Sequence, residues 1–161
     1  MGESTVEAVY RRFFPVIREK CRSMLRDSDE AQDVAQETFI RLWKSGLDLE
    51  DPRRVSAWVY RTATHLSVDR IRRRAIGTEV TGVDADVEGV GTDARIHNRQ
   101  LLERLASKIP QDELEVAILD RVDGLTQPES AEVLGISERT VRRMLTRLDA
   151  RLAALKAEVH P

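Results

Sequence analysis

The stretch TQPESAEVLGISERTVRRML, residues 126–145, has the pattern of a helix-turn-helix. Thr126 is a predicted N-cap, and Glu129, three residues later, completes a capping box. Gly135 suits the left-handed backbone that ends many helices. Ser137 is predicted to cap a second helix after a turn of about three residues, the separation found in DNA-binding helix pairs. This segment therefore predicts one helical unit with a nucleic-acid partner.

The second predicted helix of this motif is rich in arginine. Ala131 is small enough for the point where the two helices touch, and nearby aliphatic side chains can fill the crossing. A short helical hairpin with no DNA partner would show the same caps and glycine, so these features alone leave that alternative open. The basic side chains favour DNA; they are Arg139, Arg142, Arg143 and Arg147.

The net charge of −2 hides an uneven distribution. Residues 58–74 contain five arginines and one acid, and residues 137–156 contain six basic residues and two acids. Between these stretches, residues 75–94 contain five acids and no base. Two basic stretches separated by an acidic one predict two separate contacts with nucleic acid, although either stretch alone is also compatible with a solvated helix face.

Several classes of protein are disfavoured by composition. Cys21 is the only cysteine, so an intrachain disulfide is impossible, and three scattered histidines argue against a metal site. We expect no cofactor. A nucleic-acid enzyme needs clustered carboxylates for metal or an activated nucleophile, and the acids at 29–37 have no partnering basic or histidine cluster nearby. We therefore expect that the protein is not an enzyme. The sequence has no long apolar run and no signal peptide, which predicts a cytoplasmic protein.

The first half of the chain has helical periodicity. Apolar residues from 6 to 25 follow helical spacing, with Pro15 predicted to kink or break the helix. A second helix is predicted to start after Asp27 or Ser28 and to run through Trp43, and Gly46 is expected to end it.

A third helix is predicted to open at Asp51–Pro52 and to continue into the first basic run. Residues 75–94 then lose the periodicity, and their four glycines and five acids predict a flexible linker. Helical spacing resumes after the linker, and no strand pattern competes. The predicted fold is all-α, with small helical domains at residues 1–74 and 95–161.

Two blocks of the first domain resemble region 2 of extracytoplasmic-function (ECF) sigma factors: DEAQDVAQETFIRLWK, residues 29–44, and AWVYRTATHLSVDRIRRR, residues 57–74. The helix-turn-helix and the predicted helices at about 99–122 resemble region 4. The resemblance implies a promoter-specificity subunit that binds core RNA polymerase, recognises the −35 and −10 elements and assists DNA opening. The main alternative is a polymerase-independent helix-turn-helix regulator with a helical oligomerisation domain; a sigma-like protein that does not initiate is another.

The resemblance assigns polymerase docking to the second helix. Residues 27–37 carry five acids and no base, and most of these acids share one helix face. Phe39 is interpreted as a core residue, whereas core and contact roles both stay open for Trp43. The residues implied in polymerase binding are Asp29, Glu30, Asp33, Gln36, Glu37 and Trp43.

The third helix is implied to meet the −10 element, where an unpaired strand needs a basic groove and surfaces for bases. An asparagine is common in this family where His65 stands, which leaves the contact of His65 undefined. For Trp58, a core position is favoured over base stacking. The residues implied at the −10 element are Trp58, Tyr60, Arg61, His65, Asp69, Arg70 and Arg73.

The second helix of the helix-turn-helix is implied to approach the −35 major groove, where arginine can read guanine. Two residues depart from the family pattern. Ser130 replaces a usually aliphatic residue, which is expected to loosen the local core, and Met144 stands where an arginine is common, which is expected to remove a backbone contact. The residues implied at the −35 element are Ser137, Arg139, Thr140, Arg142 and Arg143, with Arg147 as a phosphate contact.

The last helix carries a heptad seam formed by Val141, Leu145, Leu148, Leu152, Leu155 and Val159. Packing of this seam against the helices at 99–122 is favoured over dimerisation. The family resemblance also admits an inhibitory anti-sigma protein as a partner that competes for this surface.

Overall fold

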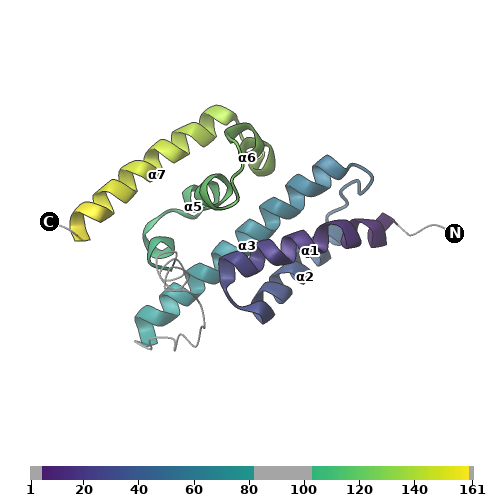
Figure 1. Cartoon of the computed structure of the whole chain (residues 1–161), viewed down its shortest axis with the longest axis horizontal. Helices are drawn as coiled ribbons and strands as arrows, with labels where there is room; N and C mark the ends of the chain where they lie inside the picture. The colour runs from purple at the N-terminus through teal and green to yellow at the C-terminus, as the bar shows by residue number, and fades with distance from the viewer. Residues whose placement is uncertain (1–4, 82–102, 160–161) are drawn as a thin grey trace. The chain divides into compact units, whose positions relative to one another are not determined.

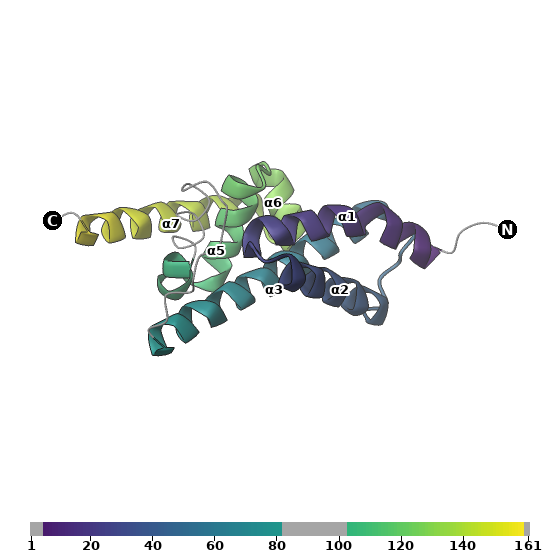
Figure 2. The same cartoon turned by 60° about the horizontal axis from the view of Figure 1, so that its bottom comes forward.

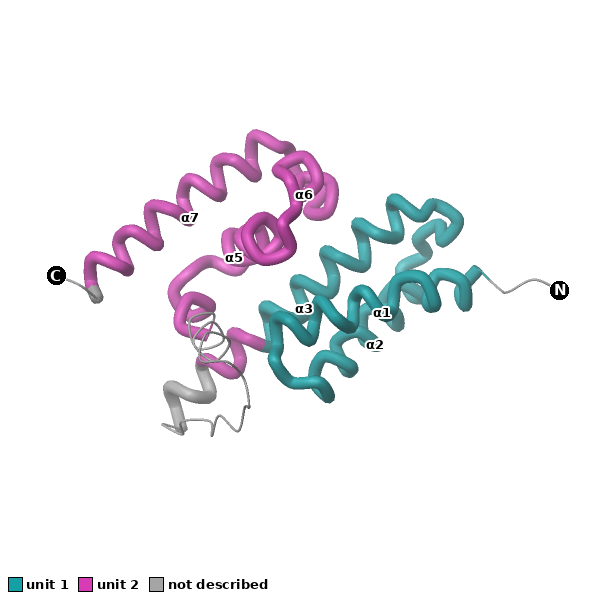
Figure 3. Tube along the Cα trace, viewed as in Figure 1, with its two compact units in different colours: residues 1–70 teal, residues 71–161 magenta. Residues whose placement is uncertain are grey.

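The computed structural model describes residues 5–81 and 103–159, and every regular element in these two ranges is helical (Figure 1). The all-α prediction is therefore confirmed. The chain divides into two compact units, residues 1–70 and residues 71–161 (Figure 3). In the described ranges, no helix is both long enough and apolar enough to cross a membrane.

The first unit is built from α1 (Thr5–Leu25), α2 (Ser28–Lys44) and the larger part of α3 (Pro52–Thr81). Helices α1 and α2 lie side by side (Figure 2) and pack along their apolar faces. The Phe39 ring of α2 is fully buried and lies 5.7 Å from the ring of Phe14 on α1, measured between centroids. Phe39 is thus a core residue, as predicted.

Local capping explains where the helices of this unit begin and end. The Glu30 backbone N–H donates to the Asp27 carboxylate at 3.1 Å, which fixes the start of α2. Gly46 has φ +74° just after the end of α2, a backbone conformation that favours glycine. The Arg54 backbone N–H donates to the Asp51 carboxylate at 3.3 Å at the start of α3. These three signals were predicted correctly.

Of the kink or break predicted at Pro15, the break is wrong, because α1 runs from Thr5 to Leu25 with this proline inside it. Proline removes one backbone hydrogen bond, but its ring lies on the exposed side of α1. Phe14 and Ile17, on either side of it, are buried in the core. Packing of the same helix face before and after the proline therefore stabilises a continuous helix.

Helix α3 continues to Thr81, so its last residues include the beginning of the segment predicted as a linker from residue 75. A single glycine costs a helix only about 1 kcal/mol relative to alanine. Gly77 is alone in this stretch and no proline follows it before Thr81. The rest of the predicted linker, residues 82–94, lies outside the described residues.

The second unit contains a helical segment at residues 103–108, then α5 (Gln111–Ala117), a π-helical turn η1 (Ile118–Val122), α6 (Gln127–Leu134) and α7 (Glu138–Val159). Helix α7 packs against both α5 and α6. The core of this unit is formed by buried aliphatic side chains, which include Leu114, Val116, Ile118, Leu119, Val141 and Leu148.

The heptad seam of α7 divides into two parts. Val141, Leu145 and Leu148 are buried within the second unit, whereas Leu152 and Leu155 are half-buried. The interpretation of the seam as a packing surface is supported for its first half. The side chain of Val159 lies outside the described residues.

Candidate functional site

The helix-turn-helix forms as predicted. The Glu129 backbone N–H donates to the Thr126 hydroxyl at 3.2 Å, and the Thr126 backbone N–H donates to the Glu129 carboxylate at 3.0 Å. This second bond holds the pKa of Glu129 below its usual value. Gly135 closes α6 with φ +66°, and the Thr140 backbone N–H donates to the Ser137 hydroxyl at 3.1 Å at the start of α7. The two helices therefore begin and end at the residues that the capping signals indicate.

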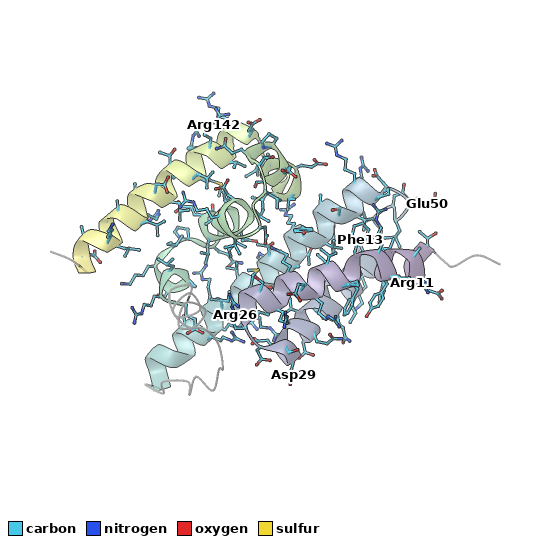
Figure 4. All side chains as sticks on the ribbon, viewed as in Figure 1. Arg11, Phe13, Arg26, Asp29, Glu50 and Arg142 are labelled. Carbon is cyan, nitrogen blue, oxygen red and sulfur yellow. The ribbon has the colours of Figure 1, made fainter. Side chains whose placement is uncertain are left out.

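The crossing of α6 and α7 is filled by small and aliphatic side chains. Ala131 and Val141 are buried at the crossing, and Val133, Leu134 and Ile136 are half-buried. Because these side chains fix α7 against α6, the side chains on the opposite face of α7 point to solvent. Figure 4 shows Arg142 extending outward from the first turns of α7.

The predicted −35 residues gather at the start of this outward face. Arg139, Arg142, Arg143 and Arg147 are exposed, Ser137 is exposed and Thr140 is half-buried. The hydroxyl oxygens of Ser137 and Thr140 lie 2.8 Å apart. Among the described residues, the structure gives no ion pair to Arg139, Arg143 or Arg147, whereas Arg142 lies 3.5 Å from the Glu138 carboxylate.

Met144 is 8% exposed and packs in the core of the second unit. Ser130 is fully buried on α6, and its hydroxyl has no hydrogen-bond partner among the residues that the structure describes. A buried hydroxyl without a partner lowers stability because it has lost its bonds to water.

Ser130→Ala should stabilise the second unit by about 1 kcal/mol, since it removes an unsatisfied buried polar group at little cost in packing. Thermal unfolding followed by far-UV circular dichroism measures the change. Ser107→Ala is a matched control, because the exposed Ser107 hydroxyl already donates to the Arg104 carbonyl at 2.9 Å. A Ser130→Ala protein that is no more stable than the parent would contradict this account.

The predicted −10 residues lie along α3 but do not share one face. Arg61, His65, Asp69 and Arg73 recur at one-turn spacing along the helix. Arg61, His65 and Arg73 are exposed, and Asp69 is half-buried. Of the predicted −10 residues, these four therefore lie along one side of α3. Trp58 belongs to the same side of α3 and is half-buried, so it is not a full core residue.

Two predicted −10 residues turn instead toward neighbouring helices of the first unit. The ammonium group of Lys20 on α1 lies 5.4 Å from the centre of the Tyr60 ring. Arg70 forms an ion pair with Glu30 of α2 at 3.5 Å. Lys20 is 7% exposed, and the sequence reasoning missed it because a lysine between apolar positions is ordinarily a solvated residue.

The acidic residues of α2 are arranged as predicted. Asp29, Asp33 and Glu37 are spaced by one turn and lie on one face. Asp29, Asp33, Gln36 and Trp43 are exposed, while Glu30 and Glu37 are half-buried. Glu37 pairs with Arg41 at 3.1 Å. Asp29 points to solvent at the start of α2 (Figure 4).

Beside this acidic face, α1 and α2 form an apolar groove of about 710 Å³. Its walls include Tyr10, Phe14, Gln36, Ile40 and Trp43. Trp43 is 43% exposed and its ring lies 6.2 Å from that of Tyr10. The Trp43 side chain thus packs against Tyr10 on one side and remains open to solvent on the other.

Ion pairs between distant segments hold α7 in the second unit. The Arg151 side chain donates to the Glu113 carboxylate at 2.8 Å, and Arg121 donates to Asp149. The Glu113 side chain is only 5% exposed. Sequence reasoning did not find these pairs, because partners so far apart in the chain leave no periodic signal.

Comparison with known proteins assigns both units. Residues 9–76 match the Sigma-70 region 2 family, and residues 99–152 match the Sigma-70 region 4 family. Two sigma domains in this order define a sigma factor of bacterial RNA polymerase. The chain belongs to the ECF sigma factors, as the resemblance of its two blocks implied.

Among its relatives, the ECF RNA polymerase sigma factor SigW of Bacillus subtilis is 31% identical over 81% of this chain and 78% of its own length. The sigma factor CnrH of Cupriavidus metallidurans is 30% identical over 86% of this chain and 80% of its own length.

Solved structures share the fold. A complex of CnrH with the cytosolic domain of CnrY matches with a TM-score of 0.58 and 24% identity, over 95% of this chain and 88% of the other. The sigma factor RpoE of Bartonella quintana, in complex with the anti-sigma factor NepR, matches with a TM-score of 0.52 and 18% identity, over 94% of this chain and 96% of the other.

Proposed function

We propose that this sigma factor divides promoter recognition between its units. Residues 1–74 bind core polymerase and the −10 element, residues 95–161 bind the −35 element, and residues 75–94 connect them. The observation that carries this proposal is the helix-turn-helix of the second unit, whose outward face presents four exposed arginines at the start of α7. Such a face supplies both positive charge for phosphates and forked donors for bases.

At the −35 element, α7 enters the major groove with its N-terminal turns. Arg142 and Arg143 read bases, and Arg139 and Arg147 contact phosphates. Ser137 and Thr140 lie at the start of α7, where the positive end of the helix dipole favours a phosphate. This division follows from position along the helix, because the groove brings the first turns nearest the base edges.

At the −10 element, the one-turn row of α3 holds the unpaired strand. Arg61 and Arg73 supply positive charge for its backbone, and Trp58 and His65 offer flat surfaces against bases. Asp69 is a hydrogen-bond acceptor in the same row. Tyr60 and Arg70 stabilise the position of α3 by contacting Lys20 of α1 and Glu30 of α2, respectively.

Helix α2 and its neighbouring groove bind core polymerase. The exposed acids Asp29 and Asp33 repel DNA phosphates and so suit a protein partner, and Gln36 and Trp43 lie on the groove beside them. Glu30 and Glu37 belong to the same helix, but each is engaged by an arginine of this chain.

Three further properties complete the proposal. The RpoE structure contains the anti-sigma factor NepR, so we include an anti-sigma protein among the partners of this chain. The sigma factor itself binds and positions polymerase and DNA, and has no catalytic centre of its own. It acts in the cytoplasm, where RNA polymerase is found.

Transcription in vitro with purified core polymerase and a library of genomic fragments tests the whole proposal. We expect discrete start sites that require this chain, each preceded by shared −35 and −10 sequences. A chain that instead binds defined duplexes as a dimer, without polymerase and without start sites, would be a conventional helix-turn-helix regulator.

Asp33→Lys should weaken binding to core polymerase by about tenfold or more, because it replaces a negative charge with a positive one in an interface whose charges are complementary. Titration of fluorescently labelled protein with core polymerase measures the affinity. Glu50→Lys is the matched control: Glu50 is also exposed but lies outside α2, in the turn before α3. Normal affinity of a correctly folded Asp33→Lys protein would remove α2 from the polymerase interface.

A further inference from the structure

Arg142 differs from Arg139, Arg143 and Arg147 in contacting two polar side chains of its own unit. Its Nε donates to Gln127 Oε1 at 3.4 Å, and its Nη2 donates to Glu138 Oε1 at 3.5 Å. Gln127 is the first residue of α6, so this contact joins the two helices of the helix-turn-helix on their DNA-facing side. No ion pair restrains Arg139, Arg143 or Arg147 among the residues the structure describes.

The geometry of the guanidinium group determines which N–H donors of Arg142 remain for DNA. Nε and Nη2 donate along one edge of the planar group, and Nη1 and Nη2 donate along its end. Gln127 and Glu138 accept from the Nε and Nη2 edge. The end of the group, with Nη1 and the second hydrogen of Nη2, is left to make a forked contact. Two parallel donors at the end of an arginine match the O6 and N7 acceptors of guanine.

We propose that Gln127 is a specificity-determining residue that acts through Arg142, orienting its guanidinium so that its end faces a guanine in the −35 element. The inference rests on the proposed function of Arg142 as a base reader. Gln127 is a positioning residue and need not touch DNA. Glu138 shares the task by accepting from Nη2 and by lowering the affinity of Arg142 for phosphate, which keeps it from acting as a general backbone contact.

Restraint of this kind favours specificity more than affinity. An unrestrained arginine can turn to a phosphate on any sequence, and its binding energy then carries no base preference. An arginine held beforehand in the reading orientation loses less side-chain freedom when it meets the correct base. Loss of Gln127 should therefore reduce the difference in affinity between the favoured −35 sequence and other sequences, with little change in the average affinity for DNA.

The experiment measures binding of the holoenzyme, at fixed salt, to promoter duplexes carrying each of the four base pairs at each −35 position. The Arg142→Ala variant first identifies the position that Arg142 reads. At that position, Gln127→Ala should lower the preference for the favoured base by about fivefold or more, the lower end of what a forked arginine–guanine pair contributes. Preferences at the other −35 positions should not change.

Two further variants separate positioning from a general structural role. Gln127→Glu keeps an oxygen acceptor for Nε and should retain the base preference, with weaker binding to all sequences because of the added negative charge. In the Arg142→Ala background, Gln127→Ala should have no further effect on preference. Thermal unfolding of the variants checks that the capping box of Thr126 and Glu129 still supports α6.

The outcomes distinguish the inference from the function on which it rests. If Arg142→Ala relaxes one position but Gln127→Ala does not, the positioning role of Gln127 is overturned and Arg142 remains a reader. An effect of Gln127→Ala that persists without Arg142, or that is equal at all positions, also overturns it. If Arg142→Ala relaxes no position, the base-reading function itself is wrong and the inference falls with it.

Discussion

Phe39→Ala should destabilise the first unit by about 3–5 kcal/mol, the usual cost of removing a buried aromatic ring from a core. The Phe39 side chain is fully buried and packs against the rings of Tyr10 and Phe14 on α1, with centroids 5.4 and 5.7 Å away. Alanine would leave a cavity between α1 and α2 that the neighbouring helices can fill only in part.

Tryptophan fluorescence during urea unfolding isolates this effect. Both tryptophans of the chain, Trp43 and Trp58, belong to the first unit, so their signal reports that unit alone. Ile40→Ala is the control next in sequence: Ile40 is 40% exposed, and we expect a loss below about 1 kcal/mol. Similar losses for the two variants would mean that Phe39 does not anchor the core.

Arg142→Ala and Arg143→Ala should each cost about 1–3 kcal/mol of −35 binding and relax the preference at one position, if each side chain reads a base. Both side chains are exposed in the first turns of α7, where a recognition helix lies closest to the base edges. The free energy lost on the consensus sequence should therefore exceed that lost on a scrambled −35 sequence.

Arg147 gives the internal comparison, since it lies about one turn further along α7 and is also exposed. Arg147→Ala should weaken binding to consensus and scrambled sequences alike and reduce the salt dependence, as loss of one phosphate contact does. Holoenzyme binding to matched promoter fragments at several salt concentrations measures both quantities. Equal losses on the two sequences for all three variants would leave α7 as an electrostatic anchor only.

Features set by neighbouring residues were predictable from the sequence. The capping box of Thr126 and Glu129, the left-handed Gly135 and the N-cap Asp27 each depend on contacts within a few residues, and all form as expected. Phe39 was identified as core because helical spacing places it among apolar residues.

Features set by contacts between distant residues were not predictable. From the sequence, Tyr60 and Arg70 were assigned to one DNA-binding surface. In the structure, Lys20 lies over the Tyr60 ring and Glu30 forms an ion pair with Arg70, and both partners come from other helices. The position of Gln127 against Arg142 depends on how two helices cross. Pro15 was overestimated as a breaker for the same reason, because the packing that supports α1 across it comes from residues elsewhere in the chain.

The continuity of α7 limits how this protein can change during evolution. One helix of 22 residues carries both the exposed arginines that we propose to bind DNA and, further along, the side chains that pack on α5. Insertion or deletion of a single residue between Arg143 and Leu148 would turn one group relative to the other by about 100°. Exchange of one exposed side chain for another therefore leaves the packing of this helix intact, whereas a change in its length would disrupt it.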